Sequence, residues 1–190
     1  KSSFMGPYAY CTDEFLIKLD LPSYPTIGVM INYNEFLVSE DDQEDIVRRL
    51  FRKADDSLIK LVRMAIDFNH ALEAKSIACA LKELGYRVAL NLMQAHGKKK
   101  DDYSGLADII ESWGAIDVLY FADSLGNMTP KKVEIVCRSL RMGWDGPIGI
   151  HTHNNKNLAL INTIIGIENG VSWCDSTIAG MGRGAGNTPT

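Results

Sequence analysis

The stretch at residues 148–155 reads Ile-Gly-Ile-His-Thr-His-Asn-Asn, an apolar run that ends in two histidines and two amides. Such a run predicts a buried β-strand, in which residues two positions apart point to the same face. We therefore expect His151 and His153 to present their imidazoles side by side, with Thr152 turned the other way. Imidazole is the commonest metal-ligating side chain in proteins. The stretch predicts a metal-ligating pair at the carboxyl end of a strand, and two hydrogen-bonded interior histidines are the alternative.

Strand-like and helix-like segments alternate on both sides of this stretch. Besides the histidine strand, we expect strands at 26–32, 59–67, 87–93, 116–122 and 171–178. We expect helices at 40–53, 69–84, 103–113 and 158–169, and one that begins at Thr129-Pro130. Strands that alternate with helices over short connections predict a parallel sheet. The natural closed form is the (β/α)8 TIM barrel, and the alternative is a doubly wound open sheet, whose usual dinucleotide fingerprint is not seen.

The chain is short for such a barrel. It has 190 residues, whereas about 200 or more are typical. Residues 1–7 hold neither an initiator Met nor an apolar signal segment, so we expect the interior of a longer chain. The prediction is a single α/β domain over residues 1–190, an incomplete barrel that lacks about its first two strands and any C-terminal extension.

Charge and composition exclude several classes of function. The net charge of -4 lacks the positive excess that is typical of nucleic-acid-binding proteins. No window approaches the roughly 20 uninterrupted apolar residues that a membrane-spanning helix needs. The cysteines show no Cys-x-x-Cys spacing, which favours reduced thiols in a cytoplasmic protein over disulfides or a zinc site. They are Cys11, Cys79, Cys137 and Cys174.

A period of two sorts the strand residues into two faces. In the strand at 59–67, the alternate residues Val62, Met64 and Ile66 form an apolar face that suits packing against helices. Arg63 lies on the opposite face and should point into the barrel interior, as should Asn91 of the next strand. A polar group in that place must be hydrogen-bonded or must contact a ligand, and both readings stay open.

Further polar residues stand where strands end. Asp123 and Ser124 follow the strand at 116–122, at the edge where such barrels place their chemistry. Ser124 could hydrogen-bond a substrate carboxylate or carbonyl, or the two residues could only shape the turn. Asp175 lies inside the last predicted strand, and we expect it to tie down a neighbouring loop.

A glycine-rich loop follows at residues 180–187. Its exposed amides could cradle an anion, or its glycines could let the backbone approach a bound substrate closely.

Three ordered motifs resemble the pyruvate-type metal-dependent aldolase and lyase superfamily, whose members are TIM barrels like HMG-CoA lyase. The motifs are Ala122-Asp123-Ser124-x-Gly126, His151-x-His153-Asn154-x-x-x-Leu158-Ala159-x-x-Asn162 and Asp175-x-x-x-Ala179-Gly180-Met181-Gly182-x-Gly184-Ala185-Gly186-Asn187. The last motif is most similar to the 4-hydroxy-2-oxovalerate aldolase branch. The resemblance covers most of the chain from about Thr26 onward.

The resemblance implies a lyase that cleaves a 4-hydroxy-2-oxo acid through a metal-bound pyruvate enolate. It implies a divalent metal, Mn or Mg, with His151 and His153 as ligands. It also implies a substrate site at Ser124, His151 and Asn187. The family's third ligand, its substrate-clamping Arg and its acid–base group belong to a first-strand motif that is not in this chain. The catalytic residues are therefore unassigned, and we expect the 190-residue chain alone to be inactive.

Two other functions stay open. One is a Claisen-type condensation of a 2-oxo acid with an acyl-CoA, as in isopropylmalate synthase. The other is a non-catalytic barrel used as a binding or assembly module. For partners, the resemblance implies a small 2-oxo acid substrate, while charge and composition argue against nucleic acid and membrane. Assembly as a homo-oligomer stays open. It implies an aldehyde dehydrogenase partner only where the C-terminal extension of the aldolase branch is present.

Overall fold

The computed structural model describes residues 11–38 and 42–190, and its centre is one parallel six-stranded sheet. The strands are β1 (Ile27–Asn32), β2 (Ile59–Asp67), β3 (Arg87–Met93), β4 (Val118–Asp123), β5 (Ile148–Thr152) and β6 (Val171–Cys174). The α-helices are α1 (Asp13–Ile17), α2 (Gln43–Leu50), α3 (Lys75–Glu83), α4 (Lys100–Glu111), α5 (Pro130–Arg141) and α6 (Ala159–Glu168). Short 3-10 segments are η2 (Tyr33–Val38), η3 (Ala54–Asp56), η4 (Phe68–Ala74) and η5 (Ile178–Gly180).

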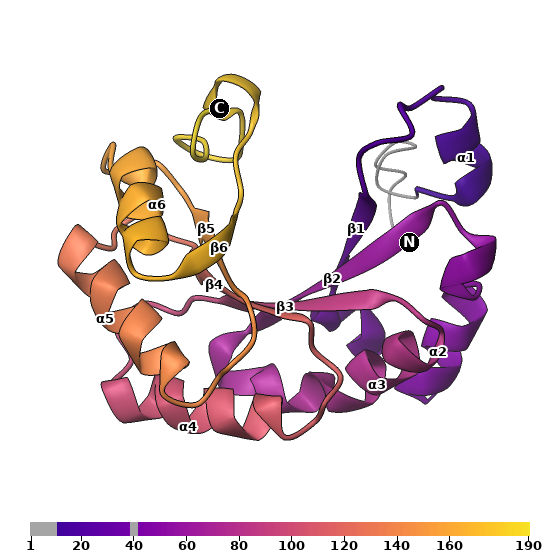
Figure 1. Ribbon diagram of the computed structural model, residues 1–190, viewed down its shortest axis with the longest axis horizontal. Coiled ribbons are helices and arrows are strands. Elements are labelled where there is room, and N and C mark those ends of the chain that lie inside the picture. The colour runs from indigo at the N-terminus through magenta and orange to yellow at the C-terminus, as the bar shows by residue number, and fades with distance from the viewer. Residues whose placement is uncertain (1–10, 39–41) are drawn as a thin grey trace.

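The strands lie in the sheet in the order in which they follow along the chain, from β1 to β6. A doubly wound sheet reverses its strand order at one point, so its order differs from the chain order. A sequential parallel order with helices between the strands is that of a TIM barrel. Helices α2 to α6 cover the outer side of the curved sheet (Figure 1). The predicted α/β barrel, seen here as a partial barrel, is confirmed, and the doubly wound alternative is wrong.

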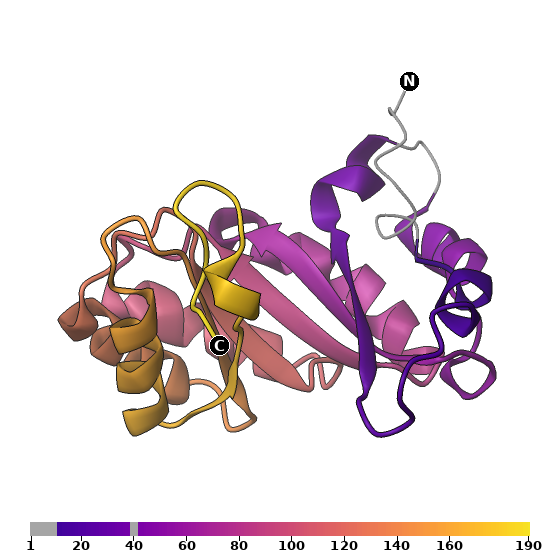
Figure 2. The ribbon, with the colours of Figure 1, turned by 90° about the horizontal axis from the view of Figure 1, so that it is seen from above.

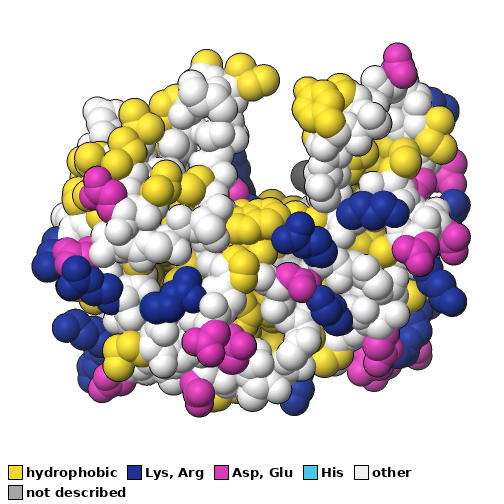
Figure 3. Space-filling model, in the orientation of Figure 1, with side chains coloured by type: hydrophobic (Ala, Val, Ile, Leu, Met, Phe, Trp, Pro, Cys, Tyr) yellow, Lys and Arg dark blue, Asp and Glu magenta, His cyan; other side chains and the backbone are white. Residues whose placement is uncertain are grey.

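The inner side of the sheet is open. β1 and the segment after β6 lie at opposite ends of the sheet (Figure 2). The space-filling view shows a hollow between them with hydrophobic side chains at its floor (Figure 3). Among the described residues, none of the helices has the length and apolar character needed to cross a membrane.

The hydrophobic core lies between the sheet and its outer helices. Val62 and Met64 have no exposed surface, and Ile66 is 1% exposed. These three side chains belong to the apolar face predicted from the period of two, and they join one large cluster with residues of the helices. The two-face prediction for β2 is confirmed.

The start of α5 follows from local chemistry. Thr129 has an extended backbone (φ -89°, ψ 159°), and its hydroxyl accepts a hydrogen bond from the Lys132 amide at 3.3 Å. Pro130 occupies the first turn, where its missing N–H costs nothing. The predicted helix start is confirmed.

Two predicted helices are shorter than expected. The helix predicted at 69–84 begins as the 3-10 segment η4, because the Asp67 carboxylate accepts a hydrogen bond from the Asn69 amide at 2.8 Å and forms a tight turn. The helix predicted at 40–53 is α2. Its first predicted residues fall in 39–41, which lie outside the described residues, as does the start of the chain at 1–10.

The last strand also ends early. It was predicted at 171–178, but β6 stops at Cys174, so Asp175 lies beyond the strand. The chain then pairs with the returning C-terminal segment, where the Thr177 amide donates to the Thr188 carbonyl at 3.0 Å. Asp175 keeps one backbone hydrogen bond to β5, from its amide to the Ile150 carbonyl at 3.1 Å, and the C-terminal segment becomes the partner from Thr177 onward.

Candidate metal and substrate site

Two imidazoles meet at the carboxyl end of β5. The Nε2 atoms of His151 and His153 are 3.3 Å apart, and the two ring planes lie at 80°. Thr152 is buried on the opposite side, where its hydroxyl contacts the Thr163 hydroxyl at 3.2 Å. The side-by-side arrangement predicted from the i, i+2 spacing is therefore confirmed. The role of the pair as metal ligands stays a prediction.

Asp175 joins this pair from the chain just after β6. Its Oδ2 atom lies 2.7 Å from Nδ1 of His151 and accepts a hydrogen bond from Nη1 of Arg63 at 2.5 Å. The expectation that Asp175 ties down a loop is wrong, because its carboxylate points into the barrel interior. The sequence held one signal for this contact: an inward-facing arginine needs a buried acceptor.

The surroundings determine the charges of these groups. Burial raises the pKa of Asp175, but the hydrogen bonds and charges of His151 and Arg63 outweigh it and hold the pKa below its ordinary value. Burial lowers the pKa of His153, and the neighbouring charges of His151 and Arg183 lower it further. These shifts favour an ionised Asp175, which contacts His151, and a neutral His153.

Arg63 rests on an aromatic ring. Its guanidinium carbon lies 3.9 Å from the centroid of the Tyr120 ring, within the range of a cation–π interaction. A Cβ atom on Gly149 would come within 2.5 Å of that ring. The glycine of the histidine stretch therefore makes room for Tyr120, a contact that no pattern in the sequence indicated. Burial raises the pKa of Tyr120 above its ordinary value, so the phenol stays neutral.

The two inward-facing polar residues are placed as predicted. Asn91 is 4% exposed, and the Arg63 side chain is 15% exposed. The Nε atom of Arg63 and the Oδ1 atom of Asn91 are buried and have no hydrogen-bond partner among the described residues. Both readings of these positions therefore stay open, since Arg63 pairs with Asp175 and still has a free donor.

Asp123 and Ser124 shape the turn after β4. The buried Asp123 carboxylate accepts hydrogen bonds from the amides of Asn127 (3.0 Å) and Met128 (2.9 Å). The Ser124 hydroxyl accepts a hydrogen bond from the Gln94 amide at 2.9 Å. Asp123 thus fits the turn-shaping alternative, while Ser124 still has its hydroxyl proton to donate.

The glycine-rich loop folds around Asn187. A Cβ atom on Gly182 would overlap the Asn187 amide, and one on Gly186 would overlap the Gly180 carbonyl. Asn187 pairs with His153 through an isolated antiparallel bridge. Its Oδ1 atom is buried and has no hydrogen-bond partner among the described residues. The glycines therefore allow close packing within the loop, of Gly182 against the Asn187 side chain and of Gly186 against the Gly180 backbone, and the bridge places Asn187 beside His153.

The donor set suits a divalent metal in part. Two neutral imidazole nitrogens are ordinary ligands for such ions. In residues 11–38 and 42–190, however, no group of three or more His, Cys, Asp or Glu side chains is arranged to hold a metal ion.

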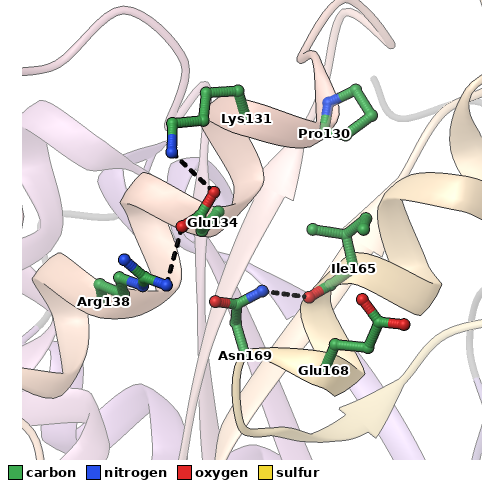
Figure 4. Close-up of a pocket in the computed structure, with 7 residues that line it drawn as sticks. All are labelled: Pro130, Lys131, Glu134, Arg138, Ile165, Glu168 and Asn169. Atoms are coloured by element: carbon green, nitrogen blue, oxygen red, sulfur yellow. Dashed lines mark hydrogen bonds and ion pairs between the residues drawn. The ribbon is translucent and has the colours of Figure 1, made fainter.

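A separate groove lies on the outer surface, between α5 and α6. It has a volume of about 440 Å³ and is lined by Pro130, Lys131, Glu134, Arg138, Ile165, Glu168 and Asn169 (Figure 4). Glu134 pairs there with Lys131 at 2.9 Å and with Arg138 at 2.8 Å. Because these charges satisfy one another in an open groove, the polar residues of the barrel interior are the better candidate site.

Comparisons with known proteins agree with the fold and with the motifs. The family model described as HMGL-like matches residues 51–190. A protein from Brevibacillus brevis named 4-hydroxy-2-oxovalerate aldolase is 39% identical over 132 residues, which are 68% of this chain and 38% of that protein. One of the same name from Geobacillus genomosp. 3 is 34% identical over 143 residues, which are 75% of this chain and 42% of that protein. The matched part therefore spans about two fifths of the length of these relatives.

Solved structures agree as well. The N-terminal domain of an aldolase-like protein from Bacteroides vulgatus matches with a TM-score of 0.86 and 31% identity, over 100% of this chain and 60% of that chain. The carboxyl transferase domain of pyruvate carboxylase from Rhizobium etli matches with a TM-score of 0.74 over 87% of this chain and 29% of that chain. Its identity is 18%, so this second likeness concerns the fold alone.

Proposed function

Because this chain belongs to the HMGL-like family, we propose that the complete protein is a divalent-metal-dependent aldolase that cleaves a 4-hydroxy-2-oxo acid. The resemblance to the 4-hydroxy-2-oxovalerate aldolase branch is confirmed by relatives of that name at 34% to 39% identity. Activity, substrate and metal are proposals for the whole protein, since the matched part spans only about two fifths of those relatives.

The histidine pair carries this proposal. Its two Nε2 atoms face each other across 3.3 Å, and His153 is kept neutral by burial. We assign His151 and His153 as ligands of Mn or Mg. A divalent cation bound there would act as a Lewis acid that polarises a substrate carbonyl.

Other residues would hold the substrate. The Ser124 hydroxyl accepts from the Gln94 amide and so can donate its own proton to a substrate carboxylate. The buried Oδ1 atom of Asn187 has no hydrogen-bond partner within the described part of the chain, and Asn187 forms the backbone bridge with His153. We assign Ser124, His151 and Asn187 to substrate binding and leave the acid–base residue unassigned.

The remaining assignments are tied to this function. We propose one barrel domain over residues 1–190 that acts on a small 2-oxo acid. The described cysteines are free, which supports a reducing, cytoplasmic location. Assembly as a homo-oligomer, and with an aldehyde dehydrogenase where a C-terminal extension is present, follow only from the likeness to the aldolase branch.

Metal content and pyruvate release test the function in the complete protein. We expect the wild type to bind Mn²⁺ and to release pyruvate from 4-hydroxy-2-oxovalerate, and His153→Ala to lose both. His70→Ala is the control, because His70 is an exposed histidine that pairs with Glu73 and not with the histidine pair. A His153→Ala protein with full metal content would refute the ligand assignment.

The same protein separates the other two functions. Free CoA formed from acetyl-CoA and a 2-oxo acid would identify a condensing enzyme. A folded protein with neither activity would be a non-catalytic module.

A further inference from the structure

We propose that Asp175 is a positioning residue that orients His151 toward the metal, and that Arg63 holds Asp175 in place. This inference rests on the function proposed above and deepens it. Neither residue would touch the metal or the substrate in this role.

The backbone places Asp175 beside the histidine strand. Its amide donates to the Ile150 carbonyl at 3.1 Å, one residue before His151. Its Oδ2 atom then lies 2.7 Å from Nδ1 of His151. An ionised carboxylate can only accept hydrogen bonds, so Nδ1 must be the donor. In the neutral ring this leaves the lone pair on Nε2, the atom that faces His153 at 3.3 Å.

Arg63 fixes the carboxylate from the other side of the barrel. It stands in β2 and reaches Oδ2 of Asp175 at 2.5 Å, across a sequence separation of 112 residues. The face of Tyr120 supports its guanidinium at 3.9 Å. The side chains of Arg63, Asp175 and His151 are 15%, 23% and 24% exposed, so water competes little for these contacts. Asp175 is therefore held by contacts from β2 and β5 at once.

This arrangement has a chemical consequence. A carboxylate that accepts a hydrogen bond from the non-ligating nitrogen of a metal-binding histidine fixes the tautomer of the ring and raises the basicity of the ligating nitrogen. Loss of such a carboxylate typically lowers metal affinity 10–100-fold. Without the Asp175 carboxylate as acceptor, the His151 ring is free to carry its proton on Nε2. A proton there would point at His153 and remove the lone pair that the metal needs.

The test combines a spectroscopic and a binding measurement on the complete protein. Histidine-labelled, metal-free wild type at pH 8 should show His151 as the Nδ1–H tautomer in ¹H–¹⁵N spectra. Asp175→Asn should lose this single tautomer, and its Mn²⁺ dissociation constant should rise about 10–100-fold.

Asp117→Asn is the matched control. The Asp117 side chain is 27% exposed and pairs with Lys82 at 2.6 Å. It stands just before β4, at the amino ends of the strands, whereas the histidines lie at the carboxyl ends. This variant loses a comparable ion pair and should keep both the His151 tautomer and the wild-type Mn²⁺ affinity.

Each outcome decides the proposal. An Nε2–H tautomer of His151 in the wild type would overturn it, and that measurement stands even if Asp175→Asn fails to fold. It would also fall if the Asp175→Asn and Asp117→Asn proteins kept the same tautomer and the same Mn²⁺ affinity. A wild type that binds no Mn²⁺ would refute the proposed function, while the tautomer comparison would still decide the role of Asp175.

Discussion

Gly149 shows how a single residue shapes the barrel interior. It lies opposite Tyr120 in the parallel register of β4 and β5, and a Cβ atom there would come within 2.5 Å of the ring. The ring is 4% exposed and supports Arg63, so it has little room to move aside. The position therefore needs a glycine for its lack of a side chain.

We expect Gly149→Ala to lower the free energy of unfolding by about 1–3 kcal/mol, because overpacking forces the ring or the strand to shift. Gly105→Ala is the control, since Gly105 is an exposed position of α4 with no atom within 4 Å of a built Cβ. This second change should raise stability by about 0.5–1 kcal/mol. Urea unfolding measures both, and equal stabilities of the two variants would contradict the packing argument.

Tyr103 makes the stability of the folded protein depend on pH in the alkaline range. Burial raises the pKa of Tyr103 from 10.0 to about 12, and its hydroxyl donates to the Ala95 carbonyl. The unfolded chain loses this proton near pH 10, whereas the folded chain keeps it. The stability that Tyr103 contributes is thus fully present below pH 10 and is lost as the pH rises toward about 12.

Tyr103→Phe should remove this dependence. We expect its free energy of unfolding to fall less steeply than that of the wild type above pH 10, and to be about 1 kcal/mol lower at neutral pH, where the hydrogen bond is lost. Urea unfolding at several pH values compares the two proteins. Parallel pH profiles would show that Tyr103 does not cause the dependence.

At the scale of elements, the turn after β4 supports the loop that carries the histidines. Gly126 has a φ of +58°, and a Cβ there would come within 2.7 Å of the His153 carbonyl. Asp123 closes this turn by accepting from two backbone amides, and it has no exposed surface. The turn after one strand thus positions the loop after the next.

We expect Asp123→Ala to cost about 1–3 kcal/mol for each amide left unsatisfied. Asp123→Asn keeps one acceptor oxygen of the same shape and should cost less. Thermal unfolding ranks the variants, and an Asn variant as unstable as the Ala variant would show that charge, not hydrogen bonding, closes the turn.

At the scale of the whole molecule, the pair of Arg63 and Asp175 joins β2 to the chain after β6 across the barrel interior. Its partly buried side chains should couple more strongly than those of an exposed pair. Arg48 and Glu83 form such an exposed pair, with side chains 44% and 66% exposed.

Double-mutant cycles test this difference. We expect a coupling free energy of roughly 0.5–3 kcal/mol from Arg63→Met and Asp175→Asn. The cycle on Arg48→Met and Glu83→Gln should give about 0.2–1 kcal/mol. Urea unfolding of the single and double variants provides the values. Equal coupling free energies in the two cycles would show that the interior pair stabilises the barrel no more than an exposed pair does.

Local patterns in the chain determined much of this protein. The period of two placed Arg63 and Asn91 inward, the i, i+2 spacing put His151 beside His153, and Thr129 marked a helix start. Such patterns suffice because side-chain direction in a strand or helix depends on near neighbours in the sequence.

The tertiary structure alone decided which distant side chains meet. The contact of Arg63 with Asp175 spans 112 residues, and Tyr120 fits only because Gly149 lies on the next strand. The predicted last strand ends early because the returning C-terminal segment pairs with Thr177, two residues after Asp175. These contacts depend on how the sheet curves and on where the chain returns, and no local period carries that information.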